Sequence, residues 1–367
     1  MKKKICLIYN YAHHYRTDIF CLMDRELSVD FVFGDKYLDV KKMDYSLLEN
    51  FKKEVKNIII FKKPIYYQSG ILRLLFDKYS SFLMLGEPIC LSTWLMLILC
   101  KVLNKKIYFW SHGWYGKEFF ITRILKKIFF SLSDGVFLYS DYSRKLMIKE
   151  NFNKEKLHVI YNSLSYDSQL KERTNIKASD TYKRHFKNNN KNLIFIGRLT
   201  KVKKLNMILE ALNLLKNKNK HYNITFIGEG ESKSDLVELV VKYNLCDVVW
   251  FYGKSYKESE LSTLIYNADL CVSPGNVGLT AIHSLNYGTP VLTHNNFAYQ
   301  MPEFEAIIPN KTGLFFEYND IISLSNKIQF WFDQKKDINQ IRKACYEIID
   351  TKFNPYYQVK VFKKYLK

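Results

Sequence analysis

Short apolar runs alternate with amphipathic segments twice along this chain, and this repeated pattern limits its fold more than any other feature. Strands and helices that alternate in this way form a parallel sheet with helices on both faces. The strands predicted in the first half are Lys4–Tyr9, Val29–Phe33, Asn57–Phe61, Lys106–Trp110, Gly135–Tyr139 and Leu157–Asn162. Those predicted in the second half are Asn192–Gly197, Asn223–Gly228, Val248–Tyr252, Leu270–Ser273 and Pro290–Thr293.

A polar stretch separates the two alternations. Residues 163–190 lose the pattern and end in an Asn/Lys run, which is typical of a linker. At 367 residues the chain is long enough for two domains with full cores. We therefore predict an α/β fold of two Rossmann-like domains facing a central cleft, a common kind of ligand site. The predicted boundaries are 1–165 for the N-terminal domain, 166–190 for a linker with one short helix, 191–350 for the C-terminal domain, and 351–367 for a C-terminal helix that crosses back to the N-terminal domain.

Helices fill the spaces between the strands of the second half. They are predicted at Leu205–Lys216, Ser232–Tyr243, Lys257–Tyr266 and Leu279–Tyr287.

The charge balance indicates an anionic partner. Lys and Arg number 56 against 36 Asp and Glu, which gives a net charge of +20. Such a field attracts nucleic acid, anionic lipid surfaces and phosphorylated small molecules, and charge alone does not choose among them. The seven cysteines form no CxxC pair, and several lie inside apolar runs, so we expect free thiols in a reducing compartment and no structural metal.

Two stretches imitate membrane or export signals. The basic start Met1–Lys4 is followed by an apolar run, Ile5–Ile8, too short for a signal peptide. The segment Pro88–Cys100 is the most apolar in the chain, but it is shorter than a bilayer span and fits a buried core helix. We therefore expect a cytoplasmic protein without transmembrane segments.

The strongest chemical signal lies where the second alternation begins. The apolar run Leu193–Ile196 is followed by Gly197, which permits a sharp turn, and then by Arg198. Lys203 follows within a basic cluster, and a helical pattern begins at Leu205. A strand end, a tight turn, an arginine and a helix amino terminus together make an anion site. The alternative is a solvated basic loop in a lysine-rich chain.

Five pieces of the second half resemble, in this order, the carboxy-terminal domain of glycosyltransferase family 4 (glycosyl transferases group 1). These are retaining, nucleotide-sugar-dependent enzymes of the GT-B fold. The resemblance covers the second half strongly and the first half weakly, and the ordered set is specific although each piece alone is weak. The pieces are Gly197–Leu205, Phe226–Leu236, Trp250–Lys254, Tyr266–Thr293 and Pro302–Phe316.

The resemblance implies a site for the donor diphosphate. It assigns Arg198 and Lys203 to the phosphates, where fixed cations stabilise the charge that develops on the departing nucleoside diphosphate. It also implies that the loop after Ser273 and the following helix amino terminus contact the same phosphates. The alternative for this loop is an ordinary βα turn. The loop residues concerned are Gly275, Asn276, Val277, Gly278, Leu279 and Thr280.

The chain departs from the family at two positions. Family members commonly carry two glutamates separated by seven residues, one for the donor sugar and one for the ribose, where this chain has Gly275 and His283. His283 could hydrogen-bond a ribose hydroxyl, whereas Gly275 offers only its backbone. Glu303 and Glu305 could substitute, with Glu305 the better aligned, or they could be surface charge. This departure leaves open a catalytically silent relative that acts as a partner or scaffold.

Other contacts follow from the resemblance. Glu229 and Lys254 lie where relatives contact the nucleotide base. His112 follows a predicted strand and is expected to make a polar contact at the reacting centre, although a turn residue is the simpler alternative. His14 and Arg16 follow the first strand and could reach the acceptor or the donor phosphate, or Arg16 could only cap local structure.

The resemblance also shapes the expected reaction. No carboxylate stands out as a double-displacement nucleophile, so it implies front-face retention. The absence of a DxD motif predicts no essential metal, and no cofactor is expected beyond the nucleotide-sugar donor. The acceptor implied is a glycan, such as a lipid-linked oligosaccharide in bacterial surface polysaccharide synthesis. A nucleic-acid-binding protein is disfavoured because no helix-turn-helix, RNA-binding sheet motif or zinc spacing occurs.

One amphipathic segment bears on membrane contact. Residues Lys117–Ser131 carry basic and aromatic residues on one helical face and apolar residues around the other, which we predict to lie in the core. The basic face suits an anionic bilayer surface at the inner side of the cytoplasmic membrane, or it is simply solvated. The first face comprises Phe119, Arg123, Lys126 and Phe130, and the second comprises Ile121, Ile124, Leu125 and Ile128.

Overall fold

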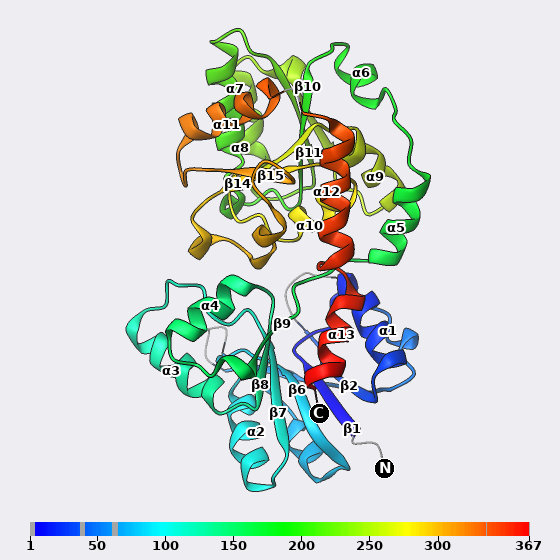
Figure 1. The fold of residues 1–367 in the computed structure, drawn as a ribbon, viewed down its shortest axis with the longest axis vertical. Coiled ribbons are helices and arrows are strands. Elements are labelled where there is room, and N and C mark those ends of the chain that lie inside the picture. The colour runs from blue at the N-terminus through cyan, green and yellow to red at the C-terminus, as the bar shows by residue number, and fades with distance from the viewer. Residues whose placement is uncertain (1–3, 37–40, 61–64, 335, 367) are drawn as a thin grey trace. The chain divides into compact units, whose positions relative to one another are not determined.

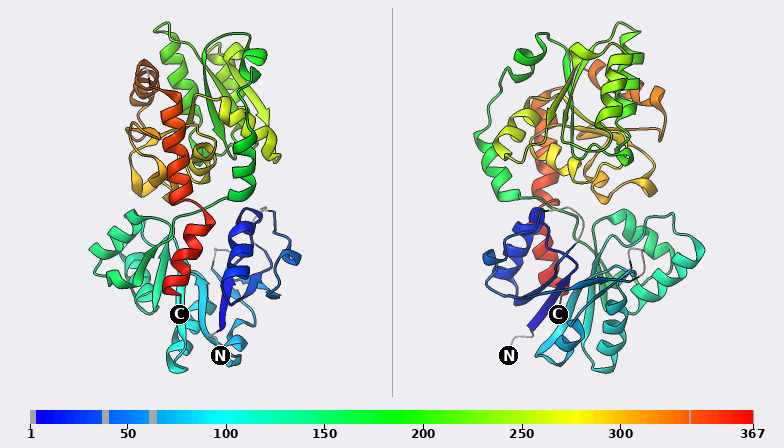
Figure 2. Two further views of the ribbon diagram at one scale, coloured as in Figure 1. Left: turned by 45° about the vertical axis from the view of Figure 1, so that its right-hand side comes forward. Right: turned by 180° about the vertical axis from the view of Figure 1, so that it is seen from behind.

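The computed structural model describes residues 4–36, 41–60, 65–334 and 336–366. It divides into two compact units, each of which is an α/β layer structure (Figures 1 and 2). Unit 1 consists of Met1–Ser165 together with Asn354–Lys367, and unit 2 consists of Tyr166–Phe353.

Unit 1 is built on a seven-stranded parallel sheet. Its strand order is β3-β2-β1-β6-β7-β8-β9, so the order of strands reverses between β1 and β6. This is the doubly wound arrangement, in which the reversal opens a crevice at the carboxyl ends of the strands. The strands are β1 (Lys4–Tyr9), β2 (Val29–Gly34), β3 (Phe51–Val55), β6 (Tyr79–Leu85), β7 (Lys106–Ser111), β8 (Gly135–Leu138) and β9 (Leu157–Val159).

Helices cover both faces of this sheet and enclose a core on each. Leu7 of β1 belongs to one core, whereas its neighbours Cys6 and Ile8 belong to the other, as the alternation of side chains along a strand requires. The helices of unit 1 are α1 (Thr17–Glu26), α2 (Leu91–Val102), α3 (Phe120–Ser131), α4 (Asp141–Lys149) and α13 (Pro355–Tyr365).

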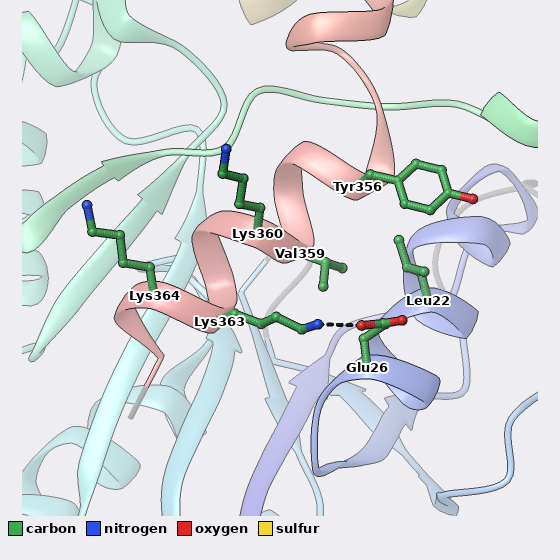
Figure 3. Close-up of a pocket in the computed structure, with 7 residues that line it drawn as sticks. All are labelled: Leu22, Glu26, Tyr356, Val359, Lys360, Lys363 and Lys364. Atoms are coloured by element: carbon green, nitrogen blue, oxygen red, sulfur yellow. Dashed lines mark hydrogen bonds and ion pairs between the residues drawn. The ribbon is translucent and has the colours of Figure 1, made fainter.

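The last helix, α13, packs against α1 within unit 1, although the two are far apart in the sequence (Figure 1). Phe362 of α13 is fully buried, with its ring 5.1 Å from Trp110 and 4.6 Å from Phe137. Figure 3 shows the groove between the two helices, where Lys363 points to Glu26 and forms an ion pair with it. The predicted end of this helix, Lys367, lies outside the described residues.

Unit 2 repeats the same arrangement with six parallel strands. The order is β12-β11-β10-β13-β14-β15, and the reversal lies between β10 and β13. The strands are β10 (Lys191–Ile196), β11 (Tyr222–Ile227), β12 (Val249–Gly253), β13 (Leu270–Ser273), β14 (Val291–His294) and β15 (Gly313–Phe316). The helices are α5 (Tyr166–Asn175), α6 (Thr181–Phe186), α7 (Asn206–Lys216), α8 (Lys233–Lys242), α9 (Glu258–Asn267), α10 (Leu279–Asn286), α11 (Ile321–Asp333) and α12 (Ile338–Thr351).

The segment predicted as a linker belongs to unit 2. Its two helices, α5 and α6, both contact α9. Tyr182 of α6 is buried and donates a hydrogen bond from its hydroxyl to the carbonyl of Leu264 at 2.7 Å. Because residues 166–190 are mostly polar, the sequence did not predict these contacts with unit 2. The predicted boundary at residue 350 also differs, because α12 continues to Thr351 and unit 2 ends at Phe353.

Most predicted strands are confirmed within a few residues, and three points differ. The predicted strand Asn57–Phe61 is not part of the main sheet: β4 (Asn57–Ile59) pairs with β5 (Tyr66–Gln68) in a separate antiparallel pair, and Phe61 lies outside the described residues. The strand beside β2 is instead β3. The strands β6 and β15 were not predicted. The strand β6 has little strand signal because it contains serine, leucine and methionine, which are not strong strand formers.

The helix α3 does not bury the face that was predicted to lie in the core. Ile121, Ile124, Leu125 and Ile128 are all exposed, and Phe129 and Phe130 make the core contact instead. Lys126, predicted on a basic surface, is largely buried and pairs with Glu118 at 2.6 Å. Within the described part of the chain, no helix combines the length and apolar character needed to cross a bilayer.

Candidate functional site: a phosphate cradle in unit 2

The site begins where the strand order of unit 2 reverses. The neighbouring strands β10 and β13 are parallel, so their carboxyl ends meet at one edge of the sheet. Gly197 follows β10 there, and the loop Pro274–Gly278 follows β13. Ligands of doubly wound sheets bind at this point. The fold therefore brings together the two segments that the sequence predicted to hold phosphate.

Two glycines bring neighbouring strand ends close together. Gly197 has a φ of +145° and Gly228 a φ of +139°. A Cβ atom on Gly228 would lie 1.9 Å from the carbonyl oxygen of Gly197, so no side chain fits. The next residue, Arg198, is exposed and forms no ion pair with another described residue. Its guanidinium therefore keeps its donors for a ligand.

Lys203 lies in a short 3₁₀ turn, Lys201–Lys203, directly against the loop after β13. Its ammonium donates a hydrogen bond to the carbonyl of Asn276 at 2.6 Å, and its own carbonyl accepts one from the amide of Gly275 at 2.9 Å. Burial lowers the pKa of Lys203 to about 8; the charge of Glu303 opposes this shift and that of Arg198 adds to it. An ammonium group has three donors, so two remain for an anion.

The amino end of α10 completes the cradle. Gly278 has φ 57° and ψ −151°, a conformation open to glycine, and no side chain caps the helix. The first amides of a helix, here those of Leu279 and Thr280, lack intrahelical acceptors and carry the positive end of the helix dipole. A Cβ atom on Gly278 would lie 3.8 Å from the ammonium of Lys203, which places this cation at the helix amino end.

The structure also narrows the predicted set of loop contacts. The amide of Val277 donates to Gln300 Oε1 at 2.9 Å, so it is not free for a phosphate. Gly275 uses its amide to bond Lys203 and its carbonyl to bond Thr293 at 3.3 Å. The hydroxyl of Thr280 donates to the carbonyl of Ile196 at 2.7 Å and so ties α10 to β10.

Gly275, which stands where relatives have a glutamate, has no room for a side chain. A Cβ atom there would lie 2.1 Å from the carbonyl oxygen of Val202 and 2.7 Å from backbone atoms of Lys203. The turn that carries Lys203 therefore approaches the loop more closely than any residue with a side chain at position 275 would permit.

His283, the second departure from the family, is paired with a carboxylate from another helix. Its Nε2 lies 2.8 Å from Oε1 of Glu258 on α9. The same oxygen accepts hydrogen bonds from the Tyr287 hydroxyl at 2.6 Å and from Gln169 Nε2 at 3.1 Å. Burial alone would raise the pKa of Glu258, but the bonds from His283, Tyr287 and Gln169 outweigh it and lower this pKa to about 2. An ionised Glu258 orients the His283 ring by accepting a hydrogen bond from Nε2, so Nδ1 is the ring nitrogen that remains for a ligand hydroxyl.

The remaining residues predicted to bind the nucleotide-sugar donor differ in their burial and in the partners that they already have. Glu303 is buried and interacts electrostatically with Lys203, whereas the better-aligned Glu305 is half-buried in the same turn. Glu229 forms an exposed ion pair with Lys233 at 2.7 Å, and a Cβ atom on Gly253 would lie 3.8 Å from its Oε1. Lys254 is exposed, with its ammonium 4.8 Å above the ring of Tyr256.

The other three predicted residues belong to unit 1. The ring of His112 lies 4.7 Å from that of Tyr139, and its carbonyl accepts a hydrogen bond from Ser143 at 2.8 Å. Burial lowers the pKa of His112 to about 4, and the charges of Arg16 and Lys126 add to this shift, so the ring is neutral at pH 7. His14 is half-buried, with Nδ1 3.2 Å from the carbonyl of Lys41, and Arg16 is buried.

Sequence reasoning missed the residues that hold the cradle in place. Gln300 accepts from the Val277 amide and donates to Thr293 at 2.8 Å and to the carbonyl of His294 at 3.0 Å. Glu258 places a carboxylate beside His283, the position where relatives carry a glutamate. Neither residue has a local signal, because the bonds that matter, Gln300 to Val277 and Glu258 to His283, join positions 23 and 25 apart.

Residues 177–348, a little under half of the chain, match the family described as glycosyl transferases group 1. This match to the glycosyl transferases group 1 family lies within unit 2. A curated relative from Klebsiella pneumoniae, an "Uncharacterized 41.2 kDa protein in cps region", is 27% identical over 296 residues, which cover 73% of this chain and 75% of the relative.

Solved structures show that the chain has the GT-B fold, as predicted. HepE of Anabaena, solved in complex with UDP, superposes with a TM-score of 0.73 at 13% identity, covering 98% of this chain and 99% of HepE. The lipopolysaccharide outer core galactosyltransferase WaaB superposes with a TM-score of 0.72 at 13% identity, covering 99% of both chains.

Proposed function

We propose that this chain is a retaining glycosyltransferase that moves a sugar from a nucleotide-diphosphate donor to a glycan acceptor. The observation that carries the proposal is the convergence of Lys203, the uncapped amino end of α10 and the exposed Arg198 at the reversal of the strand order. A cradle of this kind fits a diphosphate, since both cations and helix amides favour the charge of the leaving group.

In this proposal the unit 2 residues act on the donor alone. Arg198 and Lys203 hold the diphosphate and stabilise its charge as the bond to the sugar breaks. The Nδ1 atom of His283, held by Glu258, accepts a hydrogen bond from a ribose hydroxyl in place of the usual glutamate. Glu229 and Lys254 contact the nucleotide base, and Glu305 remains a candidate for the donor sugar.

The acceptor hydroxyl attacks the anomeric carbon from the side that the diphosphate leaves and passes its proton to the departing phosphate oxygen. The configuration is therefore retained and no covalent enzyme intermediate forms. His112 is neutral at pH 7, so its proposed role is a hydrogen bond to the reacting sugar and not a charge. We propose that the reaction needs no metal, because Arg198 and Lys203 supply positive charge to the diphosphate.

The relatives support a role in surface polysaccharide synthesis. The Klebsiella relative is described by its place in a cps region, and WaaB is described as a lipopolysaccharide outer core galactosyltransferase. HepE was solved with UDP and glucose. By analogy we propose a glycan acceptor of this class, a lipid-linked oligosaccharide.

A catalytically silent relative is the second candidate, and Gly275 favours it. The clash of any Cβ atom with Val202 and Lys203 excludes a carboxylate at that position in this backbone. Such a protein would bind nucleotide without turning over its sugar.

The test is binding followed by turnover. We expect UDP or another nucleoside diphosphate to raise the thermal midpoint of the wild type by mass action, and Arg198→Ala to abolish the shift. Lys191→Ala is the matched control, because Lys191 is also an exposed cation in the same unit. Binding without transfer or hydrolysis of the matching nucleotide sugar would support the silent relative, and no nucleotide shift in a folded wild type would contradict both candidates.

We also propose that unit 1 binds the inner face of the cytoplasmic membrane through α3. Phe119, Phe120 and Ile121 are 85%, 75% and 72% exposed at the start of this helix. Exposed aromatic and aliphatic side chains insert into the acyl boundary, and a net charge of +20 attracts anionic lipids. The contact is thus made by exposed apolar side chains, which include Phe119 of the predicted basic face and Ile121 of the face predicted to lie in the core.

Vesicle co-sedimentation tests this membrane proposal. The wild type should pellet with phosphatidylglycerol vesicles but not with phosphatidylcholine vesicles, and Phe119→Ser/Ile121→Ser should remain in the supernatant. Phe76→Ser is the control, since Phe76 is 83% exposed elsewhere in unit 1. Equal pelleting with both lipids, or no effect of the double variant, would rule the proposal out.

A further inference from the structure

Arg16 is a buried cation in an aromatic enclosure. It ends the 3₁₀ turn His14–Arg16 after β1 and is 8% exposed. Its guanidinium carbon lies 5.1 to 5.8 Å from the ring centroids of four aromatic residues, which include three at the carboxyl ends of β1, β7 and β8. The four are Tyr9, Tyr15, Trp110 and Tyr139.

The enclosure leaves most of the guanidinium donors unused. Nη2 donates to the Tyr139 hydroxyl at 2.6 Å, but Nε is buried and has no acceptor among the described residues. No described carboxylate forms an ion pair with Arg16, and this includes Asp18 in the first turn of α1. A buried charge without a counter-ion costs several kcal/mol in folded proteins. Cation–π contacts offset part of this cost but leave the N–H groups unsatisfied.

The groups around Arg16 are donors as well. Nε1 of Trp110 and Nδ1 of His112 are both buried without a partner among the described residues. An indole N–H only donates, and an imidazole nitrogen donates in one of its tautomers. The helix α1 begins directly after Arg16, whose own side chain does not cap the amino end of the helix. The local fields of the cation and the helix dipole therefore both favour an anion.

The position in the fold is that of a ligand site. The strand order of unit 1 reverses between β1 and β6, and the turn that carries Arg16 follows the carboxyl end of β1. A doubly wound sheet binds its ligands at this point. The corresponding point of unit 2 holds the candidate phosphate cradle, so Arg16 occupies the equivalent position in unit 1.

We propose that Arg16 and His112, with the amino end of α1, form an oxyanion site in unit 1 that holds a phosphate or carboxylate group of the glycan acceptor. The assignment to the acceptor rests on the proposed function, whereas the oxyanion site itself does not. A bidentate guanidinium contact fits either group, and the unused N–H groups supply the donors that an oxyanion needs.

A structural role for Arg16 predicts a different result. If the guanidinium only pins the four rings together, its removal destabilises the protein. If the guanidinium of Arg16 is instead an anion-binding group, it has no counter-ion in the free protein. Arg16→Met then leaves the thermal midpoint of the free protein unchanged or raises it, because an apolar side chain replaces an unpaired buried charge. In that case the loss appears only when the anion is added.

The experiment separates this site from the donor cradle. Arg198→Ala/Lys203→Ala removes the cradle cations, and the thermal midpoint of this protein is followed with inorganic pyrophosphate and, separately, with glucuronate. We expect one of the two anions to stabilise it, and Arg16→Met to weaken the apparent affinity at least tenfold. Arg25→Met is the control, because Arg25 is an exposed cation on the same helix, α1.

Three results would overturn the proposal. The first is no anion-dependent shift in the cradle-deficient protein, and the second is equal effects of Arg16→Met and Arg25→Met. The third is an Arg16→Met variant that lowers UDP affinity in the otherwise wild-type protein as strongly as it lowers pyrophosphate affinity, since the site would then serve the donor. The cradle variants never test transfer, so a failure of the proposed function leaves this measurement valid.

Discussion

Gly275 is the position where one methyl group should damage both stability and donor binding. Its amide bonds the carbonyl of Lys203, and the 3₁₀ turn presses against it so closely that a Cβ atom would lie 2.1 Å from the carbonyl oxygen of Val202. The clashing atoms are backbone and cannot rotate away. Gly275→Ala must therefore move the turn by about 1 Å, and the ammonium of Lys203 moves with it.

The magnitude follows from two terms. Overpacking a tight contact costs about 1–3 kcal/mol, and losing the Gly275–Lys203 hydrogen bond costs about 1 kcal/mol more. The total of about 2–4 kcal/mol lowers the thermal midpoint by roughly 4–16 °C for a unit of this size. The displaced ammonium should also weaken nucleoside diphosphate binding at least tenfold. Restoring the family glutamate by Gly275→Glu meets the same obstacle and should bring no gain of activity.

Differential scanning calorimetry and UDP titration of the same protein check both effects. Gly70→Ala is the control: Gly70 has a φ of +80°, but a Cβ atom there meets nothing within 4 Å, so only the left-handed strain of about 1 kcal/mol applies. A Gly275→Ala variant with an unchanged midpoint and unchanged UDP affinity would refute the close-approach argument.

Two further predictions concern titrating groups. The free protein holds the pKa of Lys203 at about 8, and a bound diphosphate favours the ammonium form. UDP affinity measured by calorimetry should therefore fall as pH rises from 7 to 9. A flat profile, or the same fall in Lys203→Met, would contradict this prediction. The pKa of Glu258 is lowered in the fold from 4.5 to about 2, so its contribution to stability is complete above pH 4.5 and is lost as pH falls toward 2. Glu258→Gln should therefore flatten the acid side of the stability profile and weaken UDP binding through His283, whereas Glu260→Gln, whose carboxylate pairs with Lys257 and not with His283, should leave UDP binding unchanged.

The sequence predicted much of the framework because the framework depends on local pattern. The apolar run before Gly197 and the helical spacing after Lys203 placed β10 and α7 correctly, since strands and helices have fixed periods. The strand β6 was not predicted, although it lies at the centre of its sheet. A strand buried on both faces has no alternation, and its serines and methionine favour no strand by themselves.

The structure brings together the segments that the sequence predicted for the donor site and shows that some of their groups are already hydrogen-bonded within the fold. The turn glycines and the cations have local signatures, so Gly197, Arg198, Lys203 and Gly278 could be assigned from motifs. The engagement of the Val277 amide by Gln300 could not, because that hydrogen bond joins residues 23 positions apart. A sequence pattern also does not show which loop contacts are already used inside the fold.

The amino-acid sequence was enough to predict two α/β units, the strand ends that carry the cations, and the positively charged character of the chain. Contacts between distant segments place the carboxylate of Glu258 beside His283, enclose Arg16 in aromatic rings with no counter-ion among the described residues, and leave the apolar face of α3 exposed. Backbone periodicity depends on neighbours in the sequence. Charge pairing and burial depend on which distant segments come into contact, and this is fixed only when the sheets and helices pack.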